Sequence, residues 1–232
     1  MSVTGLVLAR GGSKGIKNKN LILLNKKPLL LRCLEIMHEA ECFSSIWVST
    51  DDDKIAECAE RGGANVHRRA EYTATDRASS LCAVLEFIQH HPEICVVCIV
   101  QCTSPFLQAK YLRTAVDKIQ GGYDSVFSVT RRHLFRWSDG EPTYPQNLDP
   151  KQRPCRQEWT GDLYENGMFY ISRVNLIFEG LLQGGSHSCV GGIHSAFLSS
   201  RLPSKIFLTT LILHTSSKIS CSICSQAPSR LY

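Results

Sequence analysis

The chain alternates between short apolar runs and amphipathic helical patterns, and this alternation constrains its fold more than any other feature. One run, residues 94–101, has the nearly continuous hydrophobicity of a strand that is buried on both faces. Because strands and helices that alternate in this way form βαβ units, we predict a three-layer α/β/α domain with a mostly parallel sheet. The predicted strands are 3–9, 45–50, 94–101, 124–130 and 163–171, and the predicted helices are 28–40, 53–61, 79–90 and 107–120.

A glycine-rich loop with basic side chains follows the first predicted strand. Residues 6–15 read Leu-Val-Leu-Ala-Arg-Gly-Gly-Ser-Lys-Gly, and Lys19 and Asn20 follow closely. Glycines let backbone N–H groups approach an anion, which Arg10, Lys14 and Lys19 can neutralise. Because ligands of parallel sheets bind beyond the carboxyl ends of the strands, the loop is a candidate site for nucleotide phosphates. It fits neither the Walker A nor the GxGxxG pattern, and an ordinary turn with solvated lysines is the alternative interpretation.

Charge and apolar content exclude some classes of function. The chain has 26 basic and 21 acidic residues, a net charge of +5, but four basic and no acidic residues lie after Gly185. The charge is nearly balanced before that point, so it gives no support for nucleic-acid binding. No apolar run reaches the ~18 residues that a membrane span needs, and the first residues lack a signal-peptide pattern. We interpret the eleven cysteines as thiols of a reduced protein rather than as disulfides.

Two segments interrupt the alternation. Residues 131–160 begin with a basic and aromatic run and continue with several prolines, which argue against a central strand. We expect this segment to leave the sheet and to cover the site or pack on another subunit, since aromatic residues and arginines are enriched at interfaces. Residues 186–232 are rich in serine and lack a sustained period, so we expect a folded domain at 1–185 and a disordered tail at 186–232.

Several ordered motifs resemble one protein family. They are LARGGSKGI followed by Lys19-Asn20, VSTDDDKIA, VHRRAEYTATD, QCTSP, GYDSVFSVTRRHLFRW, RQEW and LYENGMFY. Over about residues 3–185 the chain resembles the cytidylyltransferases that activate acidic sugars, above all the animal N-acylneuraminate cytidylyltransferases. The resemblance implies a nucleotide-diphospho-sugar-transferase-like fold. It also implies transfer of CMP from CTP to N-acylneuraminate, a sialic acid, with release of pyrophosphate and with Mg²⁺ as cofactor.

The resemblance also implies which residues act. It assigns catalytic roles to Lys19 and Arg156. It assigns substrate binding to Arg10, Lys14, Asn20, Arg69, Ala78, Ser80, Gln101 and Asn166. These roles suit the residue types, because cations neutralise phosphates and amides form hydrogen bonds with either substrate. Nearby, Asp51 and Asp76 have an alternative interpretation as helix caps.

Two departures from the family pattern bear on activity. The family has another arginine at Cys155, and beyond residue 185 it has an acidic segment whose carboxylates hold Mg²⁺. This chain instead reads Ser-His-Ser-Cys-Val over residues 186–190, with no Asp or Glu after it. Hydroxyls and imidazoles are poor Mg²⁺ ligands, so we predict that the chain lacks the metal-binding residues. The phosphatase-like second domain of longer animal members is also missing, and a truncated or variant product is the simplest explanation.

Several functions stay open on the sequence. The first is an active sialic-acid cytidylyltransferase, and the second is a catalytically impaired member that acts as an oligomerisation or regulatory partner. A relative acting on the acidic sugar KDO is disfavoured by the animal-type RRHLFRW and RQEW motifs. We expect a homodimer or homotetramer that binds neither nucleic acid nor membrane. Residues 151–156 resemble a weakened nuclear-localisation cluster, so we expect the nucleus or the cytoplasm.

Overall fold

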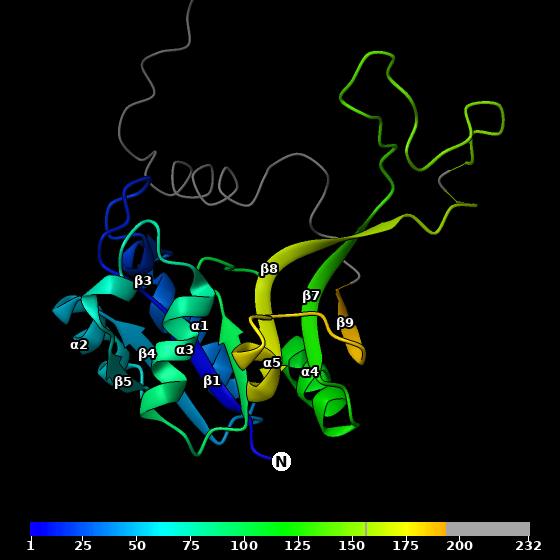
Figure 1. Ribbon diagram of the computed structural model, residues 1–232. Helices are drawn as coiled ribbons and strands as arrows, with labels where there is room; N and C mark the ends of the chain where they lie inside the picture. The colour runs from blue at the N-terminus through cyan, green and yellow to red at the C-terminus, as the bar shows by residue number, and fades with distance from the viewer. Residues whose placement is uncertain (156, 194–232) are drawn as a thin grey trace, which may run out of the picture.

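The computed structural model describes residues 1–155 and 157–193, and a seven-stranded sheet lies at its centre (Figure 1). The strand order is β5-β4-β1-β6-β8-β7-β9. The strands are β1 Thr4–Leu8, β4 Ser45–Thr50, β5 Asn65–Arg68, β6 Val96–Val100, β7 Ser125–Arg132, β8 Asp162–Arg173 and β9 Ser188–Ile193. Neighbouring strands are parallel except at β8, which is antiparallel to both β6 and β7. The mostly parallel sheet that the sequence predicts is therefore confirmed.

Helices cover both faces of this sheet. They are α1 Leu29–Glu39, α2 Asp53–Arg61, α3 Ser80–His90, α4 Ala109–Gln120 and α5 Val174–Phe178. Side chains of α1, α2 and α4 share one apolar core with Val96, Cys98 and Val100 of β6. Side chains of α3 and α5 share the other core with Val97 and Ile99. Successive residues of a strand point to opposite faces, so β6 supplies both cores and the domain has three layers.

Short elements complete the loop after β1. The 3₁₀ helix η1 covers Lys19–Leu21, and the strands β2 Leu23–Leu24 and β3 Lys27–Pro28 pair with each other. A second 3₁₀ helix, η2, covers Glu71–Thr73 between β5 and α3. No helix in the described part of the chain is long and apolar enough to cross a membrane.

Residues 133–155 and 157–161 form a long projection, here called the arm, that leaves the sheet between the end of β7 and the start of β8 (Figure 1). At its base, Arg131 Nη1 donates to the Thr160 carbonyl oxygen at 2.7 Å. Gly161 has a φ of 69°, and a Cβ at this position would lie 2.6 Å from the Arg132 carbonyl oxygen. The ring of Phe135 stacks on that of Trp159 with centroids 5.1 Å apart. The sequence analysis expects residues 131–160 to leave the sheet, but Arg131 and Arg132 still pair with β8 as the end of β7, and the chain leaves the sheet after them.

The sequence analysis ends the folded domain at Gly185, but strand β9 continues the sheet beyond this residue. The strand pairs in parallel with β7, from Ser125 opposite Ser188 to Thr130 opposite Ile193. Lys118 of α4 also donates to the Val190 carbonyl oxygen at 2.9 Å. Because the strand is short and contains two glycines, its own sequence favours an extended strand only weakly. Its contacts with β7 and α4, which are distant in the sequence, stabilise it. Residues 194–232, the rest of the expected tail, lie outside the described residues.

Candidate functional site

A pocket of about 670 Å³ lies at the carboxyl ends of the strands. Its walls come from the glycine-rich loop after β1, the segment between β5 and α3, the loop after β6 and the turn within β8. Nine of the residues singled out by the sequence line it: Arg10, Lys14, Lys19, Asn20, Arg69, Ala78, Ser80, Gln101 and Asn166. Arg156 lies outside the described residues. The volume is within the usual range for small-molecule sites.

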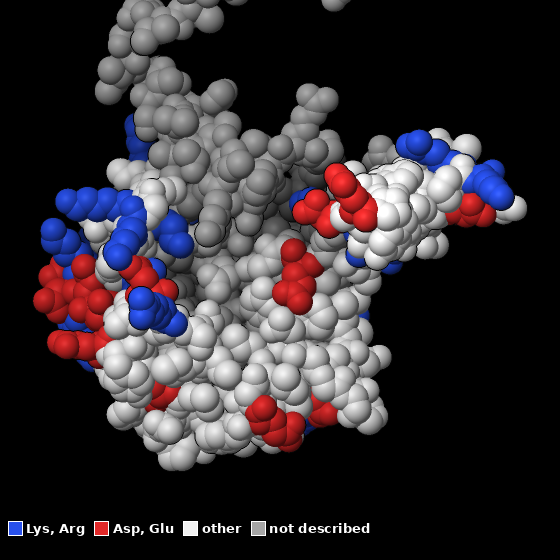
Figure 2. Space-filling view, turned by 45° about the horizontal axis from the view of Figure 1, so that its top comes forward, with Lys and Arg blue, Asp and Glu red and all other residues white. Residues whose placement is uncertain are grey.

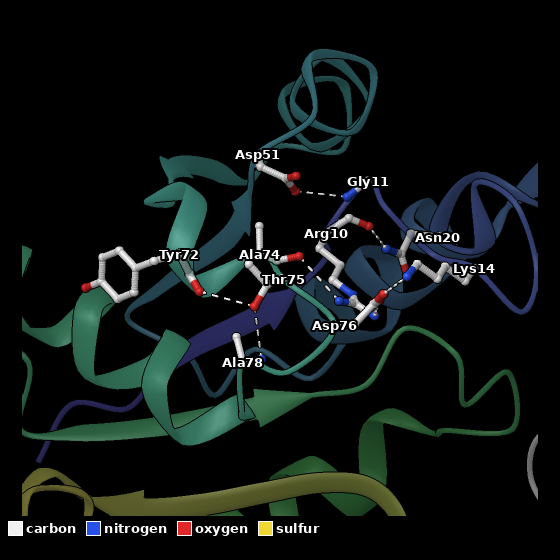
Figure 3. A network of polar contacts seen from close by, with 10 residues as sticks. All are labelled: Arg10, Gly11, Lys14, Asn20, Asp51, Tyr72, Ala74, Thr75, Asp76 and Ala78. Carbon is white, nitrogen blue, oxygen red and sulfur yellow. Dashed lines mark hydrogen bonds and ion pairs between the residues drawn. The ribbon is translucent and has the colours of Figure 1, made fainter.

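Hydrogen bonds hold the glycine-rich loop in place (Figure 3). Asn20 Nδ2 donates to the Arg10 carbonyl oxygen at 3.1 Å, and the Gly11 N–H donates to Asp51 Oδ1 at 2.9 Å. A Cβ at Gly11 would lie 2.8 Å from Asp52 Cβ, so a larger residue would push the loop away from α2. These contacts hold the loop in a conformation in which its basic side chains line the pocket.

Asp76 is the residue of this network whose role the sequence analysis missed. Its carboxylate contacts Arg10 Nη2 at 2.8 Å and Lys14 Nζ at 2.5 Å (Figure 3). The hydrogen bond from Lys14, together with the charges of Lys14 and Arg10, lowers the pKa of Asp76 from its ordinary value. The carboxylate is therefore charged at neutral pH and forms ion pairs with both cations.

The cap interpretations of Asp51 and Asp76 are wrong. Asp51 binds the backbone of the glycine-rich loop, and it is Asp52 that caps α2 by accepting from the Ile55 N–H at 3.0 Å. The cap of α3 is Ser79, which accepts from the Cys82 N–H at 3.1 Å. Both carboxylates instead order the glycine-rich loop, because each has a partner there that is far away in the sequence.

Arg69 forms a buried wall of the pocket. Its Nε donates to Ser49 Oγ at 3.1 Å, and its Nη2 is buried without a hydrogen-bond partner. Burial lowers the pKa of Arg69 from its ordinary value, while the charges of Asp51 and Glu86 raise it. A guanidinium with a free buried donor is prepared to bind an anionic or carbonyl oxygen, since an unpaired donor is costly to bury.

The opposite wall carries amides and hydroxyls. Asn166 Nδ2 donates to Thr130 Oγ1 at 3.1 Å, and Asn166 Oδ1 accepts from the Met168 N–H at 3.2 Å. Gly167 follows with a φ of 71°, which fixes the turn that presents Asn166. The hydroxyl-bearing residues that line the pocket and that the sequence analysis did not select are Ser13, Thr73, Thr75, Ser79, Thr103, Ser104 and Tyr170. Thr103 and Ser104 belong to the QCTSP motif, which is the signal that could have found them.

The donor atoms of the pocket do not fit a Mg²⁺ ion. Asp76 is the one carboxylate among the described residues that line it. Mg²⁺ needs hard oxygen ligands and is usually held by one or two carboxylates together with substrate phosphates. Here the carboxylate is already bound to Arg10 and Lys14. A Mg²⁺ requirement therefore stays a prediction from the family resemblance.

The wider surface does not present one sign of charge. On the face shown in Figure 2, Lys and Arg side chains lie next to Asp and Glu side chains, and a large part of the face is uncharged. The balanced charge of the sequence before residue 186 leads to the same expectation. The basic residues of the pocket are thus a local feature suited to a small anion.

A mostly parallel sheet, with a basic glycine-rich loop at the end of its first strand, defines an α/β protein of the nucleotide-binding kind. The family model described as cytidylyltransferase matches residues 4–185. The chain belongs to this cytidylyltransferase family.

Named relatives agree with this assignment. The chain is 48% identical to N-acylneuraminate cytidylyltransferase A of Danio rerio over 189 residues, which are 79% of this chain and 44% of that protein. It is 46% identical to N-acylneuraminate cytidylyltransferase of Oncorhynchus mykiss over 189 residues, again 79% and 44%. The protein of the same name from Escherichia coli O18:K1:H7 matches at 38% over 135 residues, 56% of this chain and 31% of that one. The chain spans less than half the length of these relatives.

Two solved structures share the fold. CMP:2-keto-3-deoxy-manno-octonic acid synthetase in complex with CTP superposes with a TM-score of 0.66 at 14% identity, covering 94% of this chain and 100% of that one. 4-Diphosphocytidyl-2C-methyl-D-erythritol synthase from Anaerococcus prevotii superposes with a TM-score of 0.61 at 11% identity, covering 92% and 98%. The expected nucleotide-diphospho-sugar-transferase-like fold is confirmed.

Proposed function

We propose that this chain binds CTP in the pocket and transfers CMP to N-acylneuraminate, with release of pyrophosphate. The observation that carries the proposal is the convergence of nine residues, selected from sequence motifs, on one cavity. Three of them, Arg10, Lys14 and Lys19, bring positive charge to the glycine-rich loop. Relatives named N-acylneuraminate cytidylyltransferase support the choice of substrate. The comparisons give no support to the alternative role as a regulatory partner.

The reaction needs positioning and charge neutralisation more than covalent chemistry from the protein. The 2-hydroxyl oxygen of the sugar attacks the α-phosphorus of CTP, the bond from that phosphorus to the bridging oxygen of pyrophosphate breaks, and the hydroxyl proton passes to solvent. Arg10, Lys14 and Lys19 bind the triphosphate and stabilise the negative charge that builds up on the leaving pyrophosphate. For this, Asp76 gives up its contacts with Arg10 and Lys14 to the phosphate oxygens. Arg69 Nη2 donates to the nucleotide.

The acceptor sugar binds along the opposite wall. Gln101 follows β6 and Asn166 is presented by the turn in β8, so both amides face the same cavity. Amides suit the hydroxyl and acylamino groups of a sugar, because they both donate and accept hydrogen bonds. Arg156, in the RQEW motif, is proposed to act on the developing phosphate charge.

The active form is proposed to be a homodimer or homotetramer assembled through the arm. Leu134, Trp137 and Tyr144 are large apolar or aromatic side chains exposed on it. Exposed aromatics beside arginines are typical of interface cores. A second subunit would bury these side chains, and the arm would reach toward that subunit's pocket.

The compartment is proposed to be the nucleus or the cytoplasm. Lys151 and Arg153 of the basic cluster are exposed on the arm, where an import factor could contact them. The Arg153 guanidinium also lies 4.5 Å from the ring centroid of Phe135. Binding of an import factor would therefore have to compete with this contact. The nuclear fraction of a fluorescent fusion, compared with that of a variant in which alanine replaces Lys151 and Arg153, tests whether the cluster directs nuclear import.

The function is tested with the purified chain, CTP, Mg²⁺ and N-acetylneuraminate. We expect calorimetry to detect CTP binding and chromatography to detect the CMP-sugar together with pyrophosphate. ATP in place of CTP, and KDO in place of the sialic acid, test the two specificities separately. Absence of CTP binding by the folded chain, or a preference for KDO, would overturn the proposal.

A further inference from the structure

We propose that His67, Glu86 and His90 form a binding site for a transition-metal dication such as Zn²⁺, separate from the nucleotide pocket. His67 lies on β5, and Glu86 and His90 lie one turn apart on α3. One ligand atom from each residue lies within 4.8 Å of the other two. None of the three lines the cavity that holds the glycine-rich loop.

The spacing is close to that of a tetrahedral zinc site. Glu86 Oε1 lies 3.5 Å from His67 Nε2 and 3.5 Å from His90 Nδ1. Bonds of the length that zinc forms with nitrogen and oxygen place two tetrahedral ligand atoms about 3.4 Å apart. The His67–Glu86 pair thus needs almost no movement. The ring of His90 has to turn, because its Nδ1 donates to the Glu86 carbonyl oxygen at 2.9 Å.

A second observation points to a missing partner at this place. Glu86 is 4% exposed and His67 is 7% exposed, yet Glu86 Oε2 and His67 Nε2 are buried without a hydrogen bond. Leaving a carboxylate oxygen and an imidazole nitrogen unpaired in the interior is costly. A cation bound by His67 Nε2 and by both oxygens of the Glu86 carboxylate would satisfy both atoms.

The surroundings hold the two buried ligands in orientation. His67 Nδ1 lies 3.1 Å from Ser49 Oγ, and the Ala70 N–H donates to Glu86 Oε1 at 3.4 Å. When Nδ1 carries the proton and donates to Ser49, the lone pair of Nε2 faces Glu86. Histidines that bind metal in proteins commonly use their second nitrogen in this way.

The ligand set also indicates which metal fits. Two imidazoles and one carboxylate suit zinc and similar transition metals, whereas Mg²⁺ prefers oxygen ligands alone. The side chain of His90 is 62% exposed, so an ion and a water molecule as fourth ligand can enter from solvent there. The positive charge of Arg69, which interacts with Glu86, opposes the cation and limits its affinity.

The test measures metal binding by the chelator-treated full chain. We expect one equivalent of Zn²⁺ to bind at micromolar concentration in calorimetry, and His90→Ala to weaken this binding at least tenfold. His187→Ala, which removes an exposed histidine elsewhere, serves as the matched control and should leave it unchanged. Because His90 is exposed, its variant should fold, and circular dichroism checks this.

Cobalt substitution separates this site from the cysteines of the chain. Co²⁺ on imidazole and carboxylate gives weak visible bands, whereas thiolate ligands add intense near-ultraviolet absorption. Glu86→Gln, which keeps the shape of the side chain, should abolish the visible bands. Binding that shows only thiolate absorption, or that is equally strong in His90→Ala, overturns the proposal, as does no binding at micromolar Zn²⁺.

Discussion

At the scale of single residues, the basic side chains of the glycine-rich loop have their own counter-ion. Asp76 bridges Arg10 and Lys14, and these three side chains come from two loops that are about 60 residues apart in the sequence. The carboxylate reduces the repulsion between the two cations. A triphosphate offers more negative charge to the same partners, so binding exchanges one anion for another.

Asp76→Asn should therefore raise the affinity for CTP several-fold, because the neutral amide competes less for Arg10 and Lys14. Calorimetric titrations at two salt concentrations measure the effect, and the gain should shrink at high salt. Asp53→Asn is the matched control, since Asp53 pairs with Arg68 at the surface and does not line the pocket. Weaker CTP binding by Asp76→Asn would instead mean that the carboxylate supports the ligand.

Arg10→Ala should weaken CTP binding by about 1.5–3 kcal/mol, the size of one charge-assisted hydrogen bond. Lys17→Ala provides the comparison, because Lys17 belongs to the same loop but is exposed and does not line the pocket. Calorimetry on both folded variants measures the difference. Unchanged affinity in Arg10→Ala would remove Arg10 from the phosphate site.

At the scale of elements, three consecutive aspartates, Asp51 to Asp53, lie at the junction between β4 and α2, and each has a different partner. Asp51 holds the glycine-rich loop, Asp52 caps α2 and Asp53 pairs with Arg68 at the surface. The junction thereby ties the start of α2 to the loop after β1. A change at each position should have its own consequence.

Asp52→Ala should lower the free energy of unfolding by about 0.5–2 kcal/mol, since it leaves the Ile55 N–H without its cap. Asp53→Ala should change it by no more than about 1 kcal/mol, because exposed ion pairs contribute little. Urea unfolding followed by circular dichroism compares the two variants. Equal losses would show that charge at the start of α2, and not the specific cap, is what matters.

At the scale of the whole molecule, the arm exposes large apolar and aromatic side chains. Trp137 is 51% exposed on a projection that stands away from the sheet (Figure 1). We predict at least a dimer, and light scattering at micromolar concentration measures the mass. Trp137→Ala should shift the equilibrium toward the monomer, while Phe178→Ala, which removes an exposed ring on α5, should not. A monomer mass for the unchanged chain would contradict the prediction.

We also predict that this chain turns over CTP very slowly although it binds the nucleotide. The pocket lined by the described residues has one carboxylate, already paired with two cations, and the sequence beyond Glu179 supplies no other. Bringing a triphosphate and an acidic sugar together requires more neutralisation than the loop cations provide. Steady-state pyrophosphate release gives kcat, and a value within about tenfold of the ordinary 1–10³ s⁻¹ range would contradict this prediction.

The alternating elements and the basic glycine-rich loop could be predicted from the sequence alone. Strand β4 and helix α2 have the predicted bounds, and the other helices predicted from apolar spacing begin within two residues of theirs. Nine of the ten residues selected from sequence motifs line one pocket. Local sequence specifies these features, because periodicity, caps and glycines act between residues a few positions apart.

Features that depend on distant partners came only from the folded structure. It placed β8 antiparallel between β6 and β7, and it paired β9 with β7 beyond the expected end of the domain. It also paired Asp76 with Arg10 and Lys14, and it placed His67 of β5 beside Glu86 of α3. Sheet register and ion pairs form between segments that the chain brings together only on folding, so no local pattern in the sequence specifies them.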